Sequence, residues 1–360
     1  MEVLLTSTSS DDNMMVSRAR AELSQPRASQ LGEFITPNHL FFVRDHFVDR
    51  PVLSDDEWRL YLTGVGVEDR TVSLAHLRSL PSKSLTVTLE CAGNGGYGRG
   101  ADRQQHHMRS MVGTAVWRGV PVATLFKKEI PPEVTEFVFR GYDGGEDPDE
   151  PVSIDCYTRS IPRVKALDDD TLLVYEMNGE PLPQEHGFPV RLMVPGWYGM
   201  DSVKWIRSIE ARSERVGHFY DDHRYRAQST DAGLHAGRRV REMAVKSLVL
   251  HPSNGQRILL GDIPISGFAW AGENHVTGVD ISFDGGQRWQ PTELGDEVRP
   301  YSWRPWSLTY QADEVGPLDF VVRAVDSEGR SQPMDALPAR TYEANWVQRV
   351  RVFVVAGLEP

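Results

Sequence analysis

A cysteine that precedes a glycine-rich loop is the most chemically distinctive feature of the sequence. Residues 85–89 alternate apolar and hydroxyl-bearing side chains and predict a strand that leads to Cys91, and five glycines follow between positions 93 and 100. The cysteine sulfur can hold a bulky group at the strand end, because glycines let backbone N–H groups approach such a group closely. We interpret this stretch as the centre of a site.

Side chains that can carry a positive charge occur on other segments, and together they predict an anion-binding cradle near this site. They are Arg44, His186, Arg191 and Lys204. Each of these residues alone is most often a surface or satisfied side chain. Together they would suit a phosphate or a polyanionic cofactor, since guanidinium and ammonium groups bind such ligands.

Two other patterns have interpretations that we disfavour. Gly93, Gly95 and Gly98 match the G-x-G-x-x-G dinucleotide motif, but no acidic residue closes a following strand about twenty residues later, which argues against a nicotinamide cofactor. The acidic run over 143–150 lacks the oxygen spacing of a calcium-binding EF-hand, so it predicts a solvated loop. Asp143 follows a predicted strand and is expected to face the site.

The composition is that of an ordinary acidic globular protein. The 360 residues carry a net charge of −12, which argues against nucleic acid or an anionic membrane as the main partner. No apolar run reaches the roughly 18 residues of a membrane-spanning helix. Residues 1–30 lack a secretory pattern, so we expect a flexible leader and a cytoplasmic protein. Cys91 and Cys156 do not form a disulfide scaffold, although a single structural pair stays open.

The remaining chain divides into two regions with different patterns. Up to about residue 215, short predicted strands are mixed with helical segments at 72–80 and 120–128. Residues 216–241 have no clear period and are interpreted as a linker. From residue 243, about seven short alternating segments within roughly 115 residues favour an immunoglobulin-like sandwich.

Five motifs, in order along the chain, resemble the sulfite oxidase family of molybdenum enzymes. They are FFVRDH at 41–46, CAGNG at 91–95, YEMNGEPLP from 175, HGFPVR at 186–191 and GMDSVKW at 199–205. The resemblance covers about residues 31–355, and it is to stand-alone, bacterial-type sulfite oxidases or dehydrogenases without a haem domain.

The resemblance implies a fold and a cofactor. After the leader, it implies an α+β domain of the sulfite-oxidase type over 31–240 and an immunoglobulin-like dimerisation domain over 241–360. It implies molybdenum on a molybdopterin with Cys91 as the metal ligand, and a soft thiolate suits this metal. Tyr175 matches a catalytic tyrosine near the metal, and Arg44 matches a catalytic, substrate-binding arginine. The positions implied to bind the cofactor are Phe42, Arg44, Asp45, His46, Cys91, Asp143, His186, Arg191, Ser202, Val203 and Lys204.

The implied activity is oxidation of sulfite to sulfate in a homodimer, with electrons passed to a separate acceptor such as a cytochrome. The sequence departs from the family at Gly95 and Gly96, at or next to which an arginine is usual. Arg99, His106 and Arg109 are the expected substrate-binding replacements. Two alternatives therefore stay open: the same cofactor acting on another oxyanion or on an S- or N-oxide, as in nitrate reduction, or a non-catalytic interaction protein.

Overall fold

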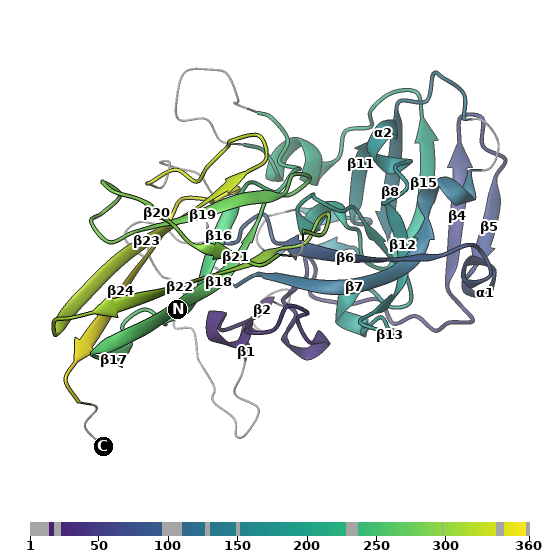
Figure 1. Cartoon of the computed structure of the whole chain (residues 1–360). Coiled ribbons are helices and arrows are strands. Elements are labelled where there is room, and N and C mark those ends of the chain that lie inside the picture. The colour runs from purple at the N-terminus through teal and green to yellow at the C-terminus, as the bar shows by residue number, and fades with distance from the viewer. Residues whose placement is uncertain are drawn as a thin grey trace.

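The computed structural model describes residues 14–17, 23–95, 110–126, 130–148, 152–227, 237–296, 298–335 and 342–357. These residues form two parts (Figure 1): a group of sheets coloured purple to teal, and a β-sandwich coloured green to yellow. The long strands β6 (Lys83–Glu90) and β7 (Val112–Pro121) extend from the side of the sandwich into the first part.

A five-stranded sheet supports the main core of the first part. Its strand order is β11-β8-β15-β4-β5, with β15 parallel to β4 and the other pairs antiparallel. Polar and apolar residues alternate along β4, so Leu60 and Leu62 are buried while Tyr61 is exposed. Because β8 and β11 pair antiparallel, the end of β8 lies beside the start of β11. The bounds are β4 Arg59–Gly64, β5 Arg70–Ser73, β8 Glu136–Gly141, β11 Thr158–Pro162 and β15 Ile206–Arg212.

A second sheet carries the cysteine. Its order is β13-β12-β7-β6, and β14 also pairs with β12. The predicted strand over 85–89 is confirmed as β6, which pairs with β7 from Lys83↔Gly119 to Glu90↔Val112. The other bounds are β12 Leu172–Met177, β13 Glu180–Pro181 and β14 Arg191–Met193.

Helices are few and short. The helix predicted over 72–80 is confirmed as α1 (Leu74–Arg78), where the Ser73 side chain caps the first turn and Leu74 and Leu77 are buried. The helix predicted over 120–128 is reduced to the 3₁₀ turn η5 (Val122–Leu125) within the described residues. The predicted linker contains a turn of π-helix, η8 (Tyr220–Arg224). The remaining helical elements are α2 Arg163–Ala166 and the 3₁₀ turns η1 Ala28–Gln30, η2 Asn38–Leu40, η6 Gln184–His186 and η7 Gly199–Asp201.

The expectation of a flexible leader over 1–30 needs correction for its last residues. β2 (Leu23–Pro26) pairs with β1 (Met14–Ser17) and with β3 (Val43–Arg44), so part of the leader belongs to a three-stranded sheet. Ser24 and Gln25 are buried, which anchors β2 to the first part. A two-stranded sheet of β9 (Gly145–Glu146) and β10 (Ser153–Ile154) follows β8.

The C-terminal part is a β-sandwich with its own core. One sheet has the order β16-β18-β22-β21 and the other β17-β24-β23-β19-β20. Inward-facing apolar residues from both sheets form one buried cluster that includes Ile265, Val279, Trp306 and Val352. The bounds are β16 Lys246–His251, β17 Arg257–Leu259, β18 Gly261–Trp270, β19 Val276–Ser282, β20 Gln290–Pro291, β21 Glu293–Leu294, β22 Arg304–Ala312, β23 Gly316–Asp326 and β24 Gln348–Val355.

Within the described ranges, no helix has the length and apolar character needed to cross a membrane.

Candidate functional site

Cys91 lies at the end of β6 in a tight turn. Its backbone N–H donates to the Met111 carbonyl at 3.0 Å, and its own carbonyl accepts from the Asn94 N–H at 2.8 Å. The side chain is nearly buried, and burial raises the pKa of the thiol. Cys91 and Cys156 are both free, so the structural disulfide left open by the sequence does not form. The turn presents a single thiol at the strand end.

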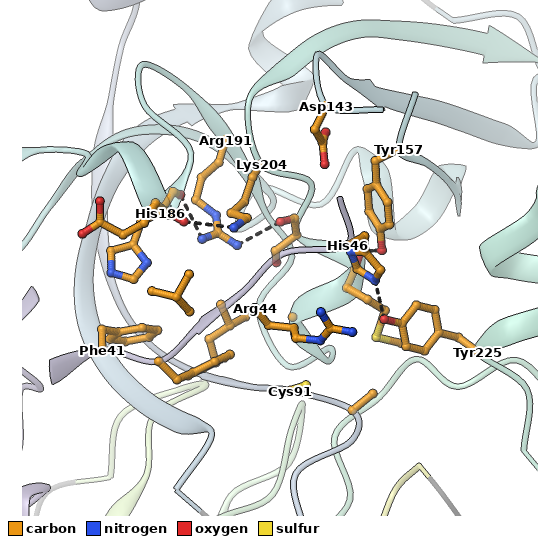
Figure 2. A pocket seen from close by; sticks show the side chains of 18 residues that line it. Phe41, Arg44, His46, Cys91, Asp143, Tyr157, His186, Arg191, Lys204 and Tyr225 are labelled. Carbon is orange, nitrogen blue, oxygen red and sulfur yellow. Dashed lines mark hydrogen bonds between the residues drawn. The ribbon is translucent and has the colours of Figure 1, made fainter. Parts of the chain in front are cut away.

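The Cys91 side chain borders a cavity that collects most of the predicted site residues (Figure 2). The empty space, including the part open to solvent, is ≈ 660 Å³. The predicted residues that line it are Phe42, Arg44, His46, Cys91, Asp143, His186, Arg191, Ser202 and Lys204. They come from segments far apart in the sequence, so the cradle inferred from scattered charges is assembled in space.

Arg191 is a buried cation at the cavity wall. Its Nη1 and Nη2 donate to the carbonyls of His186 at 3.1 Å and Ser202 at 2.9 Å, and the described residues supply no carboxylate within ion-pair distance. Burial lowers the pKa of the guanidinium to about 9. A buried cation without an anion is costly, so Arg191 fits a site that receives one.

Lys204 lies next to Arg191 at the cavity (Figure 2), and its counter-ion comes from outside the cavity lining. Its ammonium group pairs with Asp45 and donates to the Glu185 carbonyl at 2.9 Å. Burial lowers its pKa, although Asp45 opposes this effect. Asp45 does not itself line the cavity. Its carboxylate pairs with Lys204 and also accepts from Arg50 Nε at 2.7 Å.

His186 owes its position to a tight turn. It ends η6, and the following Gly187 has a φ of +107°, a conformation that favours glycine. Burial and then the charges of Arg191 and Lys204 lower the pKa of His186 to about 3, so the imidazole is neutral. Its ring meets Phe41 edge-on at 5.5 Å.

Ser202 and Val203 precede Lys204, and each accepts a hydrogen bond from a backbone N–H group of the neighbouring segment. The Ser202 hydroxyl accepts from the Val194 N–H at 3.0 Å, and the Val203 carbonyl accepts from the Leu192 N–H at 2.8 Å. The Val203 side chain is buried in the main core and does not line the cavity.

Asp143 brings a carboxyl group to the cavity two residues after β8. It is buried, and Oδ1 has no hydrogen-bond partner among the described residues. Burial raises its pKa to about 7, with Lys204 opposing the shift. Asp143 can therefore gain or lose a proton near neutral pH.

Two tyrosines that the sequence did not single out line the cavity together with His46. Tyr225 Oη lies 2.5 Å from His46 Nε2, and the Tyr157 ring stacks on the imidazole at 4.5 Å. Burial is the main cause that lowers the pKa of His46 well below 6.5, and nearby Arg44 adds to it. Figure 2 shows Arg44 between Cys91 and the His46–Tyr225 pair.

Tyr175, the predicted catalytic tyrosine, does not line this cavity. Along β12, Leu172 and Val174 pack in the same cluster as Cys91, whereas Leu173 and Tyr175 pack in the main core. The guanidinium of Arg78 lies over its ring at 5.7 Å. Strand alternation thus turns Tyr175 away from the cysteine.

The predicted substrate-binding residues Arg99, His106 and Arg109 lie outside the described residues. Arg44, which was predicted for the same role, lines the cavity.

The residues present fit a phosphate-bearing cofactor that brings its own metal ligands. In the described part of the chain, no group of three or more His, Cys, Asp or Glu side chains could hold a metal ion, so the protein offers Cys91 alone. A soft thiolate suits molybdenum, and the buried cations Arg191 and Lys204 suit a phosphate.

Family comparisons agree with this interpretation. A family model described as the oxidoreductase molybdopterin binding domain matches residues 47–220, and one described as the Mo-co oxidoreductase dimerisation domain matches residues 238–354.

Named relatives extend the match over nearly the whole chain. Sulfite oxidase of Macaca fascicularis is 33% identical over 95% of this chain and 66% of its own length, and that of Gallus gallus is 34% identical over 88% and 72%. An NADH nitrate reductase of Glycine max is 31% identical over 86% of this chain and 38% of its own length. Sulfane dehydrogenase SoxCD of Paracoccus pantotrophus superposes with a TM-score of 0.80 at 27% identity, covering 97% of this chain and 87% of its own. The chain thus spans about two thirds of the length of the first of these relatives.

The cavity and these matches define a molybdopterin-dependent oxidoreductase, whose cofactor is molybdenum on molybdopterin. The chain belongs to the sulfite oxidase family.

Proposed function

We propose that this chain oxidises sulfite to sulfate and passes the two electrons to a separate acceptor, such as a cytochrome. The observation that carries the proposal is the placement of Cys91 at a cavity lined by the cations Arg44, Arg191 and Lys204. A thiolate ligand and an excess of positive charge suit a molybdenum centre that receives a small anion. The sulfite oxidases among the relatives support the same substrate.

The residues at the cavity have separate roles in this proposal. Arg191, Lys204 and His186 hold the anionic end of the cofactor, and Cys91 holds its metal. When bound, the molybdenum centre supplies oxygen-atom transfer and two-electron chemistry. Arg44 gathers the anionic substrate beside Cys91.

Proton handling falls to the residues around His46. We assign to Tyr225 the catalytic role that the sequence predicted for Tyr175, because Tyr225 lines the cavity and shares a hydrogen bond with His46. Sulfite and water give sulfate, two protons and two electrons, so the site must release protons. Asp143, with a pKa raised to about 7 by burial, accepts one of them near neutral pH.

Two measurements, each made on the wild type and on Cys91→Ser, test the proposal. They are molybdenum content and sulfite-driven reduction of ferricyanide. We expect about one molybdenum per chain, turnover with sulfite, and loss of turnover in the variant. A wild type that contains no molybdenum after expression in a cofactor-competent host overturns the enzyme assignment.

A second candidate activity keeps the cofactor and changes the substrate. Gly95 and Gly96 replace a usual arginine, and nitrate reductases are among the relatives. Protein that contains molybdenum, ignores sulfite and reduces nitrate with a viologen donor would establish this alternative.

Several features of organisation belong to the same proposal. The match of residues 238–354 to a dimerisation domain supports a homodimer, which light scattering at micromolar concentration tests. We propose a domain division near residue 240, an immunoglobulin-like class for the sandwich, and a cytoplasmic location. An experimental structure tests the first two, and fractionation of the source cells tests the third.

A further inference from the structure

The strand that carries the cysteine has a polar face that the proposed function leaves unused. Thr88 and Glu90 are two residues apart on β6, so they point to one face, while Leu89 and Cys91 point to the other. Polar strand faces usually lie in water. Here Thr88 and Glu90 are 0% and 1% exposed.

The sandwich covers this face and bonds to it at Thr88. The Thr88 N–H donates to the Tyr301 carbonyl at 2.9 Å, and the Thr88 hydroxyl accepts from the Trp303 N–H at 2.7 Å. Both partners belong to the segment that leads into β22. β6 is therefore held by backbone groups of the C-terminal part just before the cysteine.

Glu90 makes a buried ion pair with the same part of the molecule. Its Oε1 accepts from Lys246 Nζ on β16 at 2.7 Å, and its Oε2 accepts from Trp270 Nε1 on β18 at 2.8 Å. Lys246 and Trp270 are 2% and 1% exposed. A buried ion pair is tolerated only when its remaining hydrogen bonds are made, and this one is embedded in such bonds.

The ion pair reaches the cysteine turn through Asn94. Asn94 Nδ2 donates to Glu90 Oε1 at 2.9 Å, and the Asn94 carbonyl accepts from Lys246 Nζ at 2.7 Å. The Asn94 N–H in turn closes the turn by donating to the Cys91 carbonyl at 2.8 Å. Glu90 precedes the turn and Asn94 ends it, so Lys246 ties its two ends together.

We propose that Glu90, Lys246 and Trp270 are positioning residues for the cysteine thiol. The sandwich supplies a buried ammonium group and an indole N–H that fix the turn over 91–94, so that Cys91 points into the cavity. The C-terminal part thus has a role in building the metal site, besides any role in pairing two copies. This inference rests on the proposed function only in treating Cys91 as the metal ligand.

Hydrogen–deuterium exchange of the full chain without cofactor tests the positioning directly. We expect Lys246→Met to speed exchange in a peptide covering residues 88–95 by roughly tenfold or more, because a buried carboxylate loses its counter-ion. A peptide covering β12 should keep its wild-type rate. The double variant Glu90→Gln/Lys246→Met should recover much of the protection, since it removes both charges.

Another ion pair between the two parts provides a control. Lys165 pairs with Glu273, and Glu273 also accepts from Trp197 Nε1 at 2.9 Å, so a carboxylate, an ammonium group and an indole meet here too, away from the cysteine and in a more exposed place. Lys165→Met should leave exchange over 88–95 unchanged. Trp270→Phe removes the indole hydrogen bond and part of a buried ring but leaves the Glu90–Lys246 ion pair in place, and it serves as the test variant if Lys246→Met fails to fold.

The loaded enzyme gives an independent readout. The Mo(V) electron paramagnetic resonance signal depends on how the cysteine is oriented, so it should change in Trp270→Phe and stay as in wild type in Lys165→Met. Exchange over 88–95 within about twofold of wild type in both Lys246→Met and Trp270→Phe would overturn the inference. If the wild type binds no molybdenum, the proposed function fails, while the exchange experiment still decides the positioning role.

Discussion

The phenol oxygen of Tyr225 lies 2.5 Å from Nε2 of His46, and both side chains line the cavity that Cys91 borders. The two residues are 179 positions apart in the sequence. Burial and neighbouring cations lower the pKa of His46, which favours a neutral imidazole as the partner of the Tyr225 hydroxyl. The proton-handling role that we propose for this pair rests on this contact and on its place in the cavity lining with Arg44.

Removing the phenol oxygen should reduce turnover without loss of cofactor. Tyr225→Phe keeps the ring and removes the hydrogen bond to His46, so kcat should fall by at least about tenfold while molybdenum content stays at the wild-type level. Tyr175→Phe is the control, because Tyr175 lies in the core away from the cavity. A greater loss of kcat in Tyr175→Phe would return the catalytic role to that residue.

Neutralising Asp143 should change how stability depends on pH. Its pKa is raised from 3.8 to about 7, so the folded protein keeps a proton there that the unfolded chain releases above about pH 4. Its contribution to stability is therefore fully present below pH 3.8 and is lost as pH rises through 7. Asp143→Asn should raise the free energy of unfolding at pH 8 by a few kcal/mol, on the order of 1.4 per pKa unit, and leave it nearly unchanged at pH 4.

Urea denaturation of the cofactor-free protein at the two pH values measures this difference. Equal effects of Asp143→Asn at pH 4 and pH 8 would contradict a carboxyl group that is protonated in the folded state.

Replacing Arg191 should separate cofactor binding from folding. Arg191→Met removes a buried cation that bonds to carbonyl oxygens and lies over the Trp117 ring at 5.3 Å, with no carboxylate within ion-pair distance among the described residues, so the cofactor-free protein should keep or gain stability. Molybdenum content should fall by roughly tenfold or more, because the anionic end of the cofactor loses its guanidinium.

Arg241→Met is the matched control for this change. Arg241 also lies over a tryptophan, with its guanidinium 4.8 Å from the Trp197 ring, and donates to the Ser160 carbonyl at 2.7 Å, but it does not line the cavity. Full molybdenum content in Arg191→Met would show that Arg191 does not bind the cofactor.

A buried ion cluster of Arg159, Asp201 and Asp221 should be important for the stability of the fold. Arg159 Nε lies 2.8 Å from Asp201 and its Nη1 lies 3.0 Å from Asp221, with all three side chains 0% exposed. Arg159→Met would leave two carboxylates buried without their cation and should cost about 3–5 kcal/mol of unfolding free energy. Arg118→Met, which breaks the exposed pair with Glu176, should cause little change in the same denaturation experiment.

The part of the site that the sequence predicts is the part with a strong local pattern. Alternation along 85–89 predicts β6 and the placement of Cys91 at its end, and the structure agrees. His186 ends a short turn and Arg191 begins a strand five residues later, so one local motif brings the two residues close together.

The missed residues lack such a pattern. Tyr225 follows a single turn of π-helix in a segment with no apolar period, and only packing against His46 gives it a role. Tyr157 precedes β11 and reaches the cavity because that strand pairs with β8. Tyr175 is the opposite case: its motif is recognisable, but its place outside the cavity lining depends on the alternation of β12 and on which face of that strand meets the cysteine.

The pairing of β2 with β3 extends the folded domain upstream of the residues that the family model matches. The molybdopterin family match begins at residue 47, whereas Arg44 and His46 lie before it and β2 supports them from still further upstream. A protein trimmed to the matched region would keep Cys91 and lose both the arginine that faces it and the histidine that Tyr225 contacts. Any expression boundary for a functional enzyme therefore belongs before residue 23, in sequence that family matching alone would discard.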